Sequence, residues 1–166
     1  MGRDKARLPF RGGHLAGAVA AAVAGAVGNV TLVGHPELPG IPDLYPGQGP
    51  LGGILSALTH SGTPWSLIAA CDLPEVSVPF LSALLERAMR SPAAVVLPAG
   101  PDGRPQPLCA LYHQRARVPL EDQFARGVRR VGQALAGLEV EPVRVGEIRH
   151  FHNVNTPEDW VPYAAK

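Results

Sequence analysis

The chain has 166 residues, a formal net charge of +1 and a composition that is 46% hydrophobic but only 17% charged. This length suits one domain with its own core, and the near-neutral charge argues against a surface for nucleic acids or other polyanions. The one tight basic cluster, Arg126, Arg129 and Arg130, is interpreted as a solvated helix face. The apolar run 15–27 is too short to cross a membrane, and no signal peptide is visible, so we expect a soluble, cytoplasmic protein.

Short apolar runs alternate with longer helical stretches along the chain. We predict strands at 29–34, 65–72, 93–98, 107–113 and 140–146, and helices at 14–27, 50–60, 77–90, 129–137 and from Pro157 onward. Strands that are apolar on both faces suit a parallel sheet covered by helices on both sides. This alternation predicts an α/β fold, a three-layer α/β/α, Rossmann-like, doubly wound sandwich with a mostly parallel sheet.

The clearest predicted helix is 77–90, with Ser77 as its N-cap. Four apolar side chains recur on one face of this helix: Leu81, Leu84, Leu85 and Met89.

The cysteines and tryptophans are interpreted as structural residues. Cys71 and Cys109 lie far apart in apolar surroundings without metal-ligand spacing, and we interpret both as buried free thiols. Trp65 and Trp160 are predicted to pack in the core rather than to stack on bases.

The start of the chain does not fit a complete doubly wound fold. No strand is predicted before the first helix, although the first strand of such a sheet is usually central and the loop after it cradles phosphates. Lys5 and Leu8 therefore open a chain from which that strand is absent.

An apolar strand ends at an aspartate in "IAACDLP" (68–74). Ligands of open α/β sheets bind outside the carboxyl ends of the strands, which places Asp72 where chemistry takes place. A carboxylate there suits Mg²⁺, a hard cation that takes one or two carboxylates together with substrate phosphates. The alternative is that Asp72 only caps the segment that follows.

The segment "DLYPGQGPLGGILSAL" (43–58) is rich in glycine and proline before it becomes helical. Such a loop presents backbone amides at a helix N-terminus, which is physically a site for anions or small ligands. Asp43 lies just before it, where its carboxylate suits a base or ribose donor or merely stabilises the turn. Turns of this kind are common, so the segment alone identifies no ligand.

The segment "HNVNTPEDW" (152–160) carries two asparagines two positions apart. In an extended stretch Asn153 and Asn155 point to the same side, and their amides suit a heteroaromatic ring with amide-like edges. The alternative is that Asn155 and Thr156 only organise the start of the last helix.

The order and spacing of these motifs carry more information than any one of them. "MGRDK", "GPLGG", "AACDLP", "PLCALY" and "NVNTPEDW", in this order, resemble the molybdenum cofactor guanylyltransferases, the MobA-like nucleotidyltransferase family. The resemblance covers essentially the whole chain, and "NVNTPE" and "CDLP" are its most specific parts. The family's N-terminal signature runs roughly LAGG-x-S-x-R-M-G-x-D-K, so the resemblance implies a single domain over 1–166 that lacks the first strand and the LAGG part of the loop.

The resemblance implies transfer of GMP from Mg²⁺-bound GTP to molybdenum-bearing molybdopterin, with pyrophosphate as the second product. Lys5 is implied to neutralise the nucleotide phosphates, and Asp72 to bind Mg²⁺ and position those phosphates. The other implied contacts are nucleotide contacts from Asp43, Gly49, Pro50, Leu51 and Gly52, and pterin contacts from Asn153 and Asn155. Proteins that deliver molybdopterin or mature molybdoenzymes are implied partners.

Two kinds of alternative remain open. One is a related nucleotidyltransferase, either a molybdopterin cytidylyltransferase or a sugar-phosphate enzyme. The cytidylyl branch tends to carry "DIDTPED" where this chain has asparagines at 153 and 155, which favours the guanylyl branch. The other is a degenerate, non-catalytic paralogue that keeps the pterin-facing loop but has lost the nucleotide loop.

Overall fold

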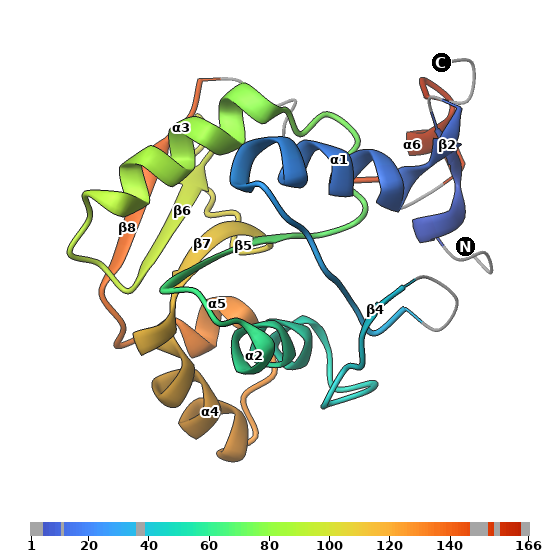
Figure 1. The fold of residues 1–166 in the computed structure, drawn as a ribbon. Helices are drawn as coiled ribbons and strands as arrows, with labels where there is room; N and C mark the ends of the chain where they lie inside the picture. Colours follow the sequence, from blue (N-terminus) through green and yellow to red (C-terminus); the bar gives the residue numbers. More distant parts are fainter. Residues whose placement is uncertain (1–4, 11, 36–38, 147–152, 155–156, 164–166) are drawn as a thin grey trace.

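A four-stranded sheet in the order β5-β7-β6-β8 forms the centre of the molecule (Figure 1). The computed structural model describes residues 5–10, 12–35, 39–146, 153–154 and 157–163. Its elements in chain order are η1 (Lys5–Arg7), β1 (Pro9–Phe10), β2 (Gly13–His14), α1 (Leu15–Val27), β3 (Leu32–Val33), β4 (Gly40–Ile41), α2 (Pro50–His60), β5 (Trp65–Ala69), α3 (Val78–Met89), β6 (Val95–Ala99), β7 (Cys109–His113), η2 (Gln114–Ala116), α4 (Arg117–Ala125), α5 (Val131–Ala134), β8 (Val140–Arg144) and α6 (Pro157–Trp160).

Three of the four central strands point the same way. β5 and β6 each pair antiparallel with β7, so they run parallel to each other, and β6 pairs parallel with β8. The predicted mostly parallel sheet is therefore confirmed, with one reversed strand at its centre. The apolar pattern of β7 did not reveal its direction, because parallel and antiparallel strands buried on both faces have the same composition.

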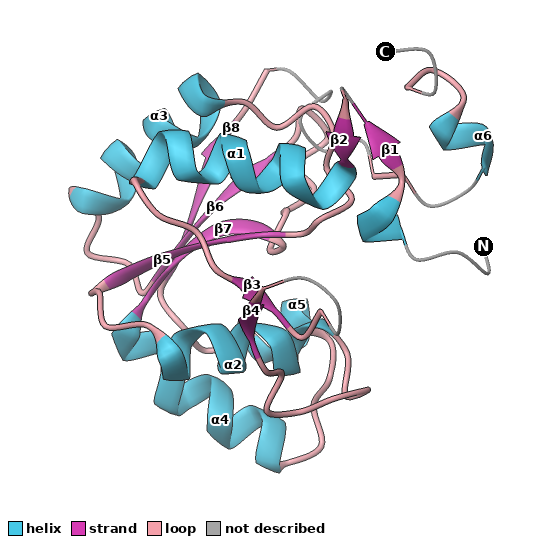
Figure 2. Cartoon of the chain, turned by 45° about the vertical axis from the view of Figure 1, so that its right-hand side comes forward, coloured by secondary structure: helices cyan, strands magenta, loops and turns pink. Residues whose placement is uncertain are grey.

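Helices cover both faces of this sheet, as Figure 2 shows. Alternate side chains of β5 demonstrate the layering: Leu67 packs with residues of α1 and α3, whereas the next residue, Ile68, packs with residues of α2, α4 and α5. All five residues of β6 are buried, which is expected for a strand with helices above and below it. The three-layer α/β/α prediction is confirmed.

The predicted long helices agree with α1, α2 and α3 to within one residue at each end. On α3, Leu81 and Leu84 of the apolar face are buried, but Met89 in the last turn is 67% exposed, so the buried part of this face ends before it. Ser77 is the N-cap residue of α3, yet its side chain makes no capping hydrogen bond. No helix was predicted at α4, because only Leu120 of its nine residues is buried and its apolar periodicity is weak.

The two thiols differ in their surroundings. Cys109 on β7 is buried, and burial raises the pKa of its thiol to about 12. Cys71 is exposed, because it stands in the turn after β5 rather than in the strand itself, so the interpretation of both thiols as buried was wrong for Cys71. Both are free cysteines. Trp65 and Trp160 pack against hydrophobic clusters, as predicted.

A short antiparallel hairpin precedes α1, where no strand was expected. Pro9 pairs with His14 and Phe10 with Gly13, and the turn between them uses Gly12 at a positive φ of 78°. Phe10 is 3% exposed and joins a hydrophobic cluster with residues near the other end of the chain. A two-residue strand leaves too little alternation in the sequence to be recognised.

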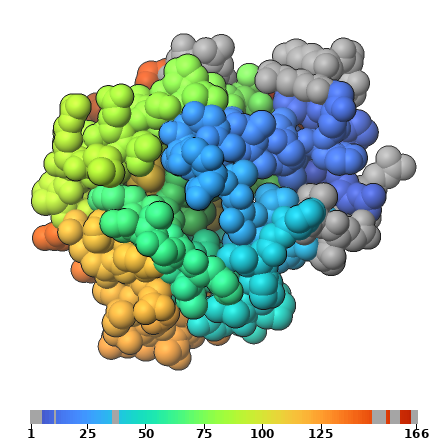
Figure 3. Space-filling model, in the orientation of Figure 1, coloured from blue at the N-terminus to red at the C-terminus, as the bar shows by residue number. Residues whose placement is uncertain are grey.

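The sheet is divided next to β5. Among the described residues β3 pairs with β4 alone, in a separate two-stranded parallel sheet, and Leu32–Val33 is the part of the predicted strand 29–34 that forms a strand. A cavity of about 70 Å³ lies between α1, the segment 30–32 and β5. In Figure 3 the cyan residues around β4 form the surface between the blue N-terminal region and the start of α2. The absence of a first strand before the first long helix, as the sequence indicates, stays a prediction.

None of the helices in the described part of the chain is long and apolar enough to span a membrane.

Candidate functional site

The carboxyl end of β5 lies beside the segment that carries the two asparagines. The backbone amide of Val154 donates a hydrogen bond of 3.0 Å to the carbonyl of Asp72. The side chain of Val154 is 1% exposed. It packs in a hydrophobic cluster, here called the terminal cluster, whose buried members are Leu8, Phe10, Leu15, Val154 and Tyr163. Two motifs separated by about half of the chain therefore meet at the sheet edge, as the doubly wound fold predicts.

Asp72 occupies the turn after β5 and is half-buried, with its Oδ1 atom shielded from solvent. The buried residues Leu73 and Pro74 follow it and fix the direction in which the chain leaves the sheet. No group of three or more His, Cys, Asp or Glu side chains suited to a metal ion occurs among the described residues. The donor set fits Mg²⁺ only as one protein carboxylate completed by substrate phosphates, which is a common arrangement for this ion.

Asp43 is held by hydrogen bonds at the base of the glycine-rich loop. Its Oδ1 accepts from the backbone amide of Tyr45 at 2.9 Å and from the hydroxyl of Ser56 at 2.8 Å. The same hydroxyl accepts from the amide of Leu44 at 2.9 Å and lies 2.9 Å from the carbonyl of Gly52. Every hydrogen bond to this carboxylate from the described residues goes to Oδ1, so Oδ2 is the atom that remains for a ligand.

The loop enters α2 through a glycine at a positive φ, a backbone conformation that other residues rarely adopt. Gly49 is the N-cap residue with φ 81°, and Pro50 begins the helix, where its missing N–H costs no hydrogen bond. Gly52 is buried against the loop and leaves no room for a side chain, since a Cβ atom at this position would lie 2.9 Å from Cβ of Tyr45. The first turn of α2 carries no acidic residue, which suits an anion, and the anion site at this helix N-terminus stays a prediction.

The remaining predicted residues are only partly described. Lys5 begins η1 in the segment that leads to the hairpin, and its side chain lies outside the described part of the chain. Asn153 is exposed next to Val154, whereas Asn155 and Thr156 lie outside the described residues. In Figure 1 the hairpin, β4 and α6 lie on one side of the molecule.

Sequence reasoning missed the residues that hold these segments together. Phe10 packs against the rings of Trp160 and Tyr163, with centroid distances of 6.1 and 5.9 Å. Tyr163 also hydrogen-bonds the side chain of Glu75, three residues after Asp72, and burial together with this carboxylate raises the pKa of its phenol. Ser56 had a sequence signal, since it is the polar residue in an otherwise apolar helix segment.

Comparison with known proteins decides the family. The model of the MobA-like NTP transferase domain matches residues 1–140 of this chain. The chain belongs to the MobA-like NTP transferase domain family. The resemblance to this family is thereby confirmed over the part of the chain that carries "CDLP" and "GPLGG".

Relatives in this family carry consistent names. A probable molybdenum cofactor guanylyltransferase of Bacillus cereus is 30% identical over 177 residues, which covers 97% of this chain and 88% of that protein. One of Bacillus mycoides is 34% identical over 131 residues, covering 75% of this chain but only 64% of that protein, which is less than two thirds of its length.

A solved structure matches the whole fold. The molybdopterin-guanine dinucleotide biosynthesis protein A of Archaeoglobus fulgidus is 26% identical, with a TM-score of 0.82 over 99% of this chain and 90% of that one. The expected nucleotidyltransferase fold is therefore confirmed for this member of the MobA-like family.

Proposed function

We propose that this MobA-like chain is a molybdenum cofactor guanylyltransferase. In the reaction a terminal phosphate oxygen of molybdenum-bearing molybdopterin attacks the α-phosphorus of GTP. A new P–O bond forms, the bond from the α-phosphorus to the bridging oxygen of the β-phosphate breaks, and pyrophosphate leaves with that electron pair. Such a transfer depends on positioning and on charge neutralisation rather than on a covalent nucleophile.

One observation carries the proposal: the hydrogen bond from the Val154 amide to the backbone carbonyl of Asp72 brings the asparagine segment beside the strand end that carries this aspartate. A pterin held by Asn153 and Asn155 then reaches a nucleotide phosphate at Asp72. Mg²⁺, when bound, neutralises phosphate charge and lowers the cost of bringing two anionic substrates together. Molybdopterin binding to the Asn153→Asp protein, compared with wild type, is the direct check on the pterin assignment.

The nucleotide side of the proposal uses the loop before α2. Lys5 pairs with the phosphates, and Oδ2 of Asp43 accepts from the guanine nucleotide, while Oδ1 stays bound to the loop itself. The segment 49–53 lines the nucleotide pocket with backbone amides at a helix N-terminus. We place this reaction in the cytoplasm, with molybdopterin supplied by partner proteins.

The test is transfer of label from α-³²P-GTP to molybdopterin with Mg²⁺ present, using wild-type protein, Asp72→Asn and Asp122→Asn. Asp122 is an exposed carboxylate on α4 and serves as the matched control. Loss of the Asp72 carboxylate is expected to lower the rate by about 10²- to 10³-fold, as for other preorganised electrostatic groups, and the control is expected to retain wild-type activity.

Each other outcome contradicts a defined part of the proposal. Retained turnover in Asp72→Asn would remove the assigned role of that carboxylate. Transfer from CTP in preference to GTP would favour the cytidylyl alternative. Wild-type protein that binds molybdopterin but neither nucleotide would favour the degenerate, non-catalytic paralogue.

A further inference from the structure

Arg129 bridges two segments that are 81 residues apart in the chain. Its Nε donates a hydrogen bond of 2.9 Å to Oε1 of Gln48, in the loop just before α2. Its Nη1 donates to the carbonyls of Phe124 and Val128, at 2.7 and 3.0 Å. The two carbonyls fix the plane of the guanidinium, so that Nε is aimed at Gln48.

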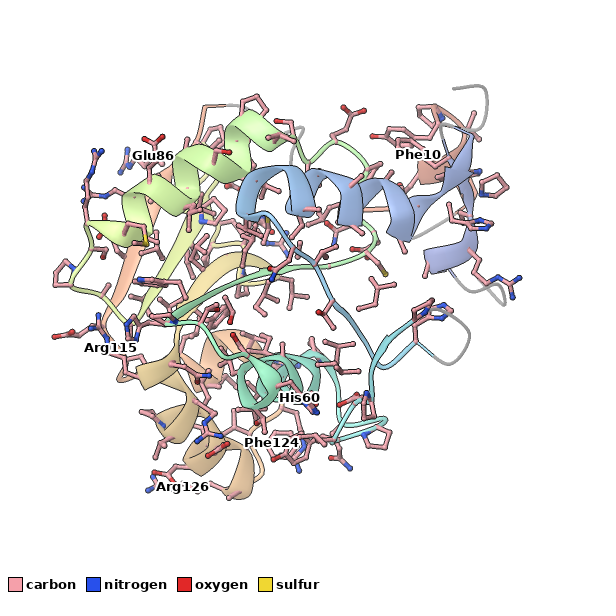
Figure 4. The ribbon with its side chains drawn as sticks, viewed as in Figure 1. Phe10, His60, Glu86, Arg115, Phe124 and Arg126 are labelled. Atoms are coloured by element: carbon pink, nitrogen blue, oxygen red, sulfur yellow. The ribbon has the colours of Figure 1, made fainter. Side chains whose placement is uncertain are left out.

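The same guanidinium closes a stack of aromatic rings. Its central carbon lies 3.9 Å from the ring centroid of Phe124, which is a cation–π contact. The Phe124 ring in turn lies 4.7 Å from that of Tyr45, at an interplanar angle of 56°. We call Tyr45, Gln48, Phe124 and Arg129 the loop clamp. Figure 4 places Phe124 next to the loop that precedes α2, and Arg126 farther out at the end of α4.

The clamp corrects the interpretation of the three arginines as one solvated face. Arg126 and Arg130 are exposed, but Arg129 is half-buried and lies after α4 rather than on it. Gly127, at a φ of 89°, reverses the chain after α4. Arg129 thereby returns over the ring of Phe124, five residues before it, a contact that no helical face could provide.

The loop needs such support on its outer side. Its inner side is fixed by Asp43 and Ser56, as described above, but its outer tip contains Pro46 and two glycines at positive φ, Gly47 and Gly49. Glycine gains the most conformational freedom when a loop is released, so an unclamped tip would sample many states. Gln48 is the side chain within that tip to which Arg129 binds.

We propose that Arg129 is a positioning residue of the nucleotide site, which acts through Gln48 to hold the segment 44–52 in its binding conformation. This inference rests on the proposed function for the identity of the ligand. Ordering the loop before binding reduces the entropy that the nucleotide would otherwise have to offset. We assign Arg129 a positioning role and not a catalytic one, because its Nε and Nη1 donors are directed to Gln48 and to the end of α4.

The first test does not depend on any ligand. Amide hydrogen exchange of the free protein is compared between wild type, Arg129→Ala, Gln48→Ala and the control Arg126→Ala. Both clamp variants are expected to exchange about tenfold faster at residues 44–52, while β6 and β7 keep their protection. Unchanged exchange in Arg129→Ala would overturn the proposal, and loss of protection throughout the molecule would assign Arg129 to global stability instead.

The second test is a double-mutant cycle on the Kd for GTP with Mg²⁺. Arg129→Ala and Gln48→Ala are each expected to weaken binding by about tenfold, and the double variant by no more than either alone, because both break one link. Arg129→Lys is expected to behave as Arg129→Ala, since an ammonium lacks the planar fork. Rescue by lysine or additive effects would indicate direct contact of Arg129 with the phosphates and would overturn the proposal.

The two tests separate the inference from the proposed function. If wild-type protein binds no nucleotide, the proposed function and the assignment of a nucleotide site fail together. The exchange experiment then still decides whether Arg129 orders the loop. If wild type binds GTP and Arg129→Ala binds it equally well, the inference alone fails.

Discussion

The two sides of the candidate site are built in opposite ways. The loop side, residues 43–56, is held by hydrogen bonds between groups close in sequence, such as Asp43 and Ser56, 13 residues apart. The terminal side is held by the rings of Phe10, Trp160 and Tyr163, from the two ends of the described chain. At the base of the loop a polar, local network thus stands opposite an apolar, long-range one, and the contacts of Arg129 and Phe124 with the loop are its long-range exception.

This difference predicts which property, stability or ligand binding, is lost when contacts on each side are removed by mutation. Ring contacts between distant segments form only when the whole chain has folded, so their loss lowers the free energy of unfolding of the entire domain. Local hydrogen bonds set the shape of one loop, so their loss changes ligand binding with a smaller effect on the fold. The predictions below separate these two expectations, beginning with the largest effect.

Phe10→Ala is the strongest test of the terminal side. Truncation of a 3% exposed aromatic ring is expected to lower the free energy of unfolding by about 3–5 kcal/mol, measured by urea denaturation at low temperature. Val161→Ala is the control, because this side chain near α6 is 70% exposed and its loss is expected to cost less than about 0.5 kcal/mol. A cost below about 1 kcal/mol for Phe10→Ala would contradict the proposed role of the cluster.

Ser56→Ala is the corresponding test of the loop side. The hydroxyl of Ser56 is buried, and its removal takes a partner from the amide of Leu44 and from Oδ1 of Asp43. A cost of about 1–3 kcal/mol is expected from these unsatisfied groups, together with about tenfold weaker GTP binding in calorimetric titration. Ser82→Ala, at a half-buried position on α3, is the control. Unchanged GTP affinity in Ser56→Ala would show that the network does not shape the binding loop.

The same contrast explains what could be predicted from the sequence. Asp43, Asp72 and the glycine loop are recognisable because strand ends, turns and helix starts have local signatures. Ser56 is recognisable for the same reason, as a polar residue one helical turn after Gly52 in an apolar helix. The three long helices followed from their apolar periodicity, which is also a local property.

Contacts between distant segments left no such signature. Nothing in "RLPF" indicates that Phe10 meets Trp160, and nothing around Arg129 indicates that its guanidinium reaches Gln48. The direction of β7 was hidden for a related reason, since composition records burial but not pairing. Only the folded chain shows these relationships.

The smallest expected effect concerns the phenol hydroxyl of Tyr163, which links the end of the described chain to Glu75, just after the "CDLP" segment. Tyr163 is 8% exposed, and burial, followed by the charge of Glu75 and the hydrogen bond to it, raises the pKa of its phenol. A raised folded-state pKa contributes stability that is fully present below the unfolded pKa, near 10, and is lost as the pH rises through the folded pKa. Tyr163→Phe is therefore expected to cost about 1 kcal/mol at pH 7 and progressively less above pH 10.

Urea denaturation of wild type and Tyr163→Phe from pH 7 to pH 11 measures this effect. Cys109 and Tyr112, whose pKa values burial also raises, contribute the same alkaline loss to both proteins and cancel in the difference. Glu75→Gln keeps an acceptor for the phenol but removes the charge, so its curve is expected to fall less steeply than wild type at high pH. Parallel curves for all three proteins would show that the phenol contributes only its ring, leaving Val154 and its bond to Asp72 as the polar link between the two motifs.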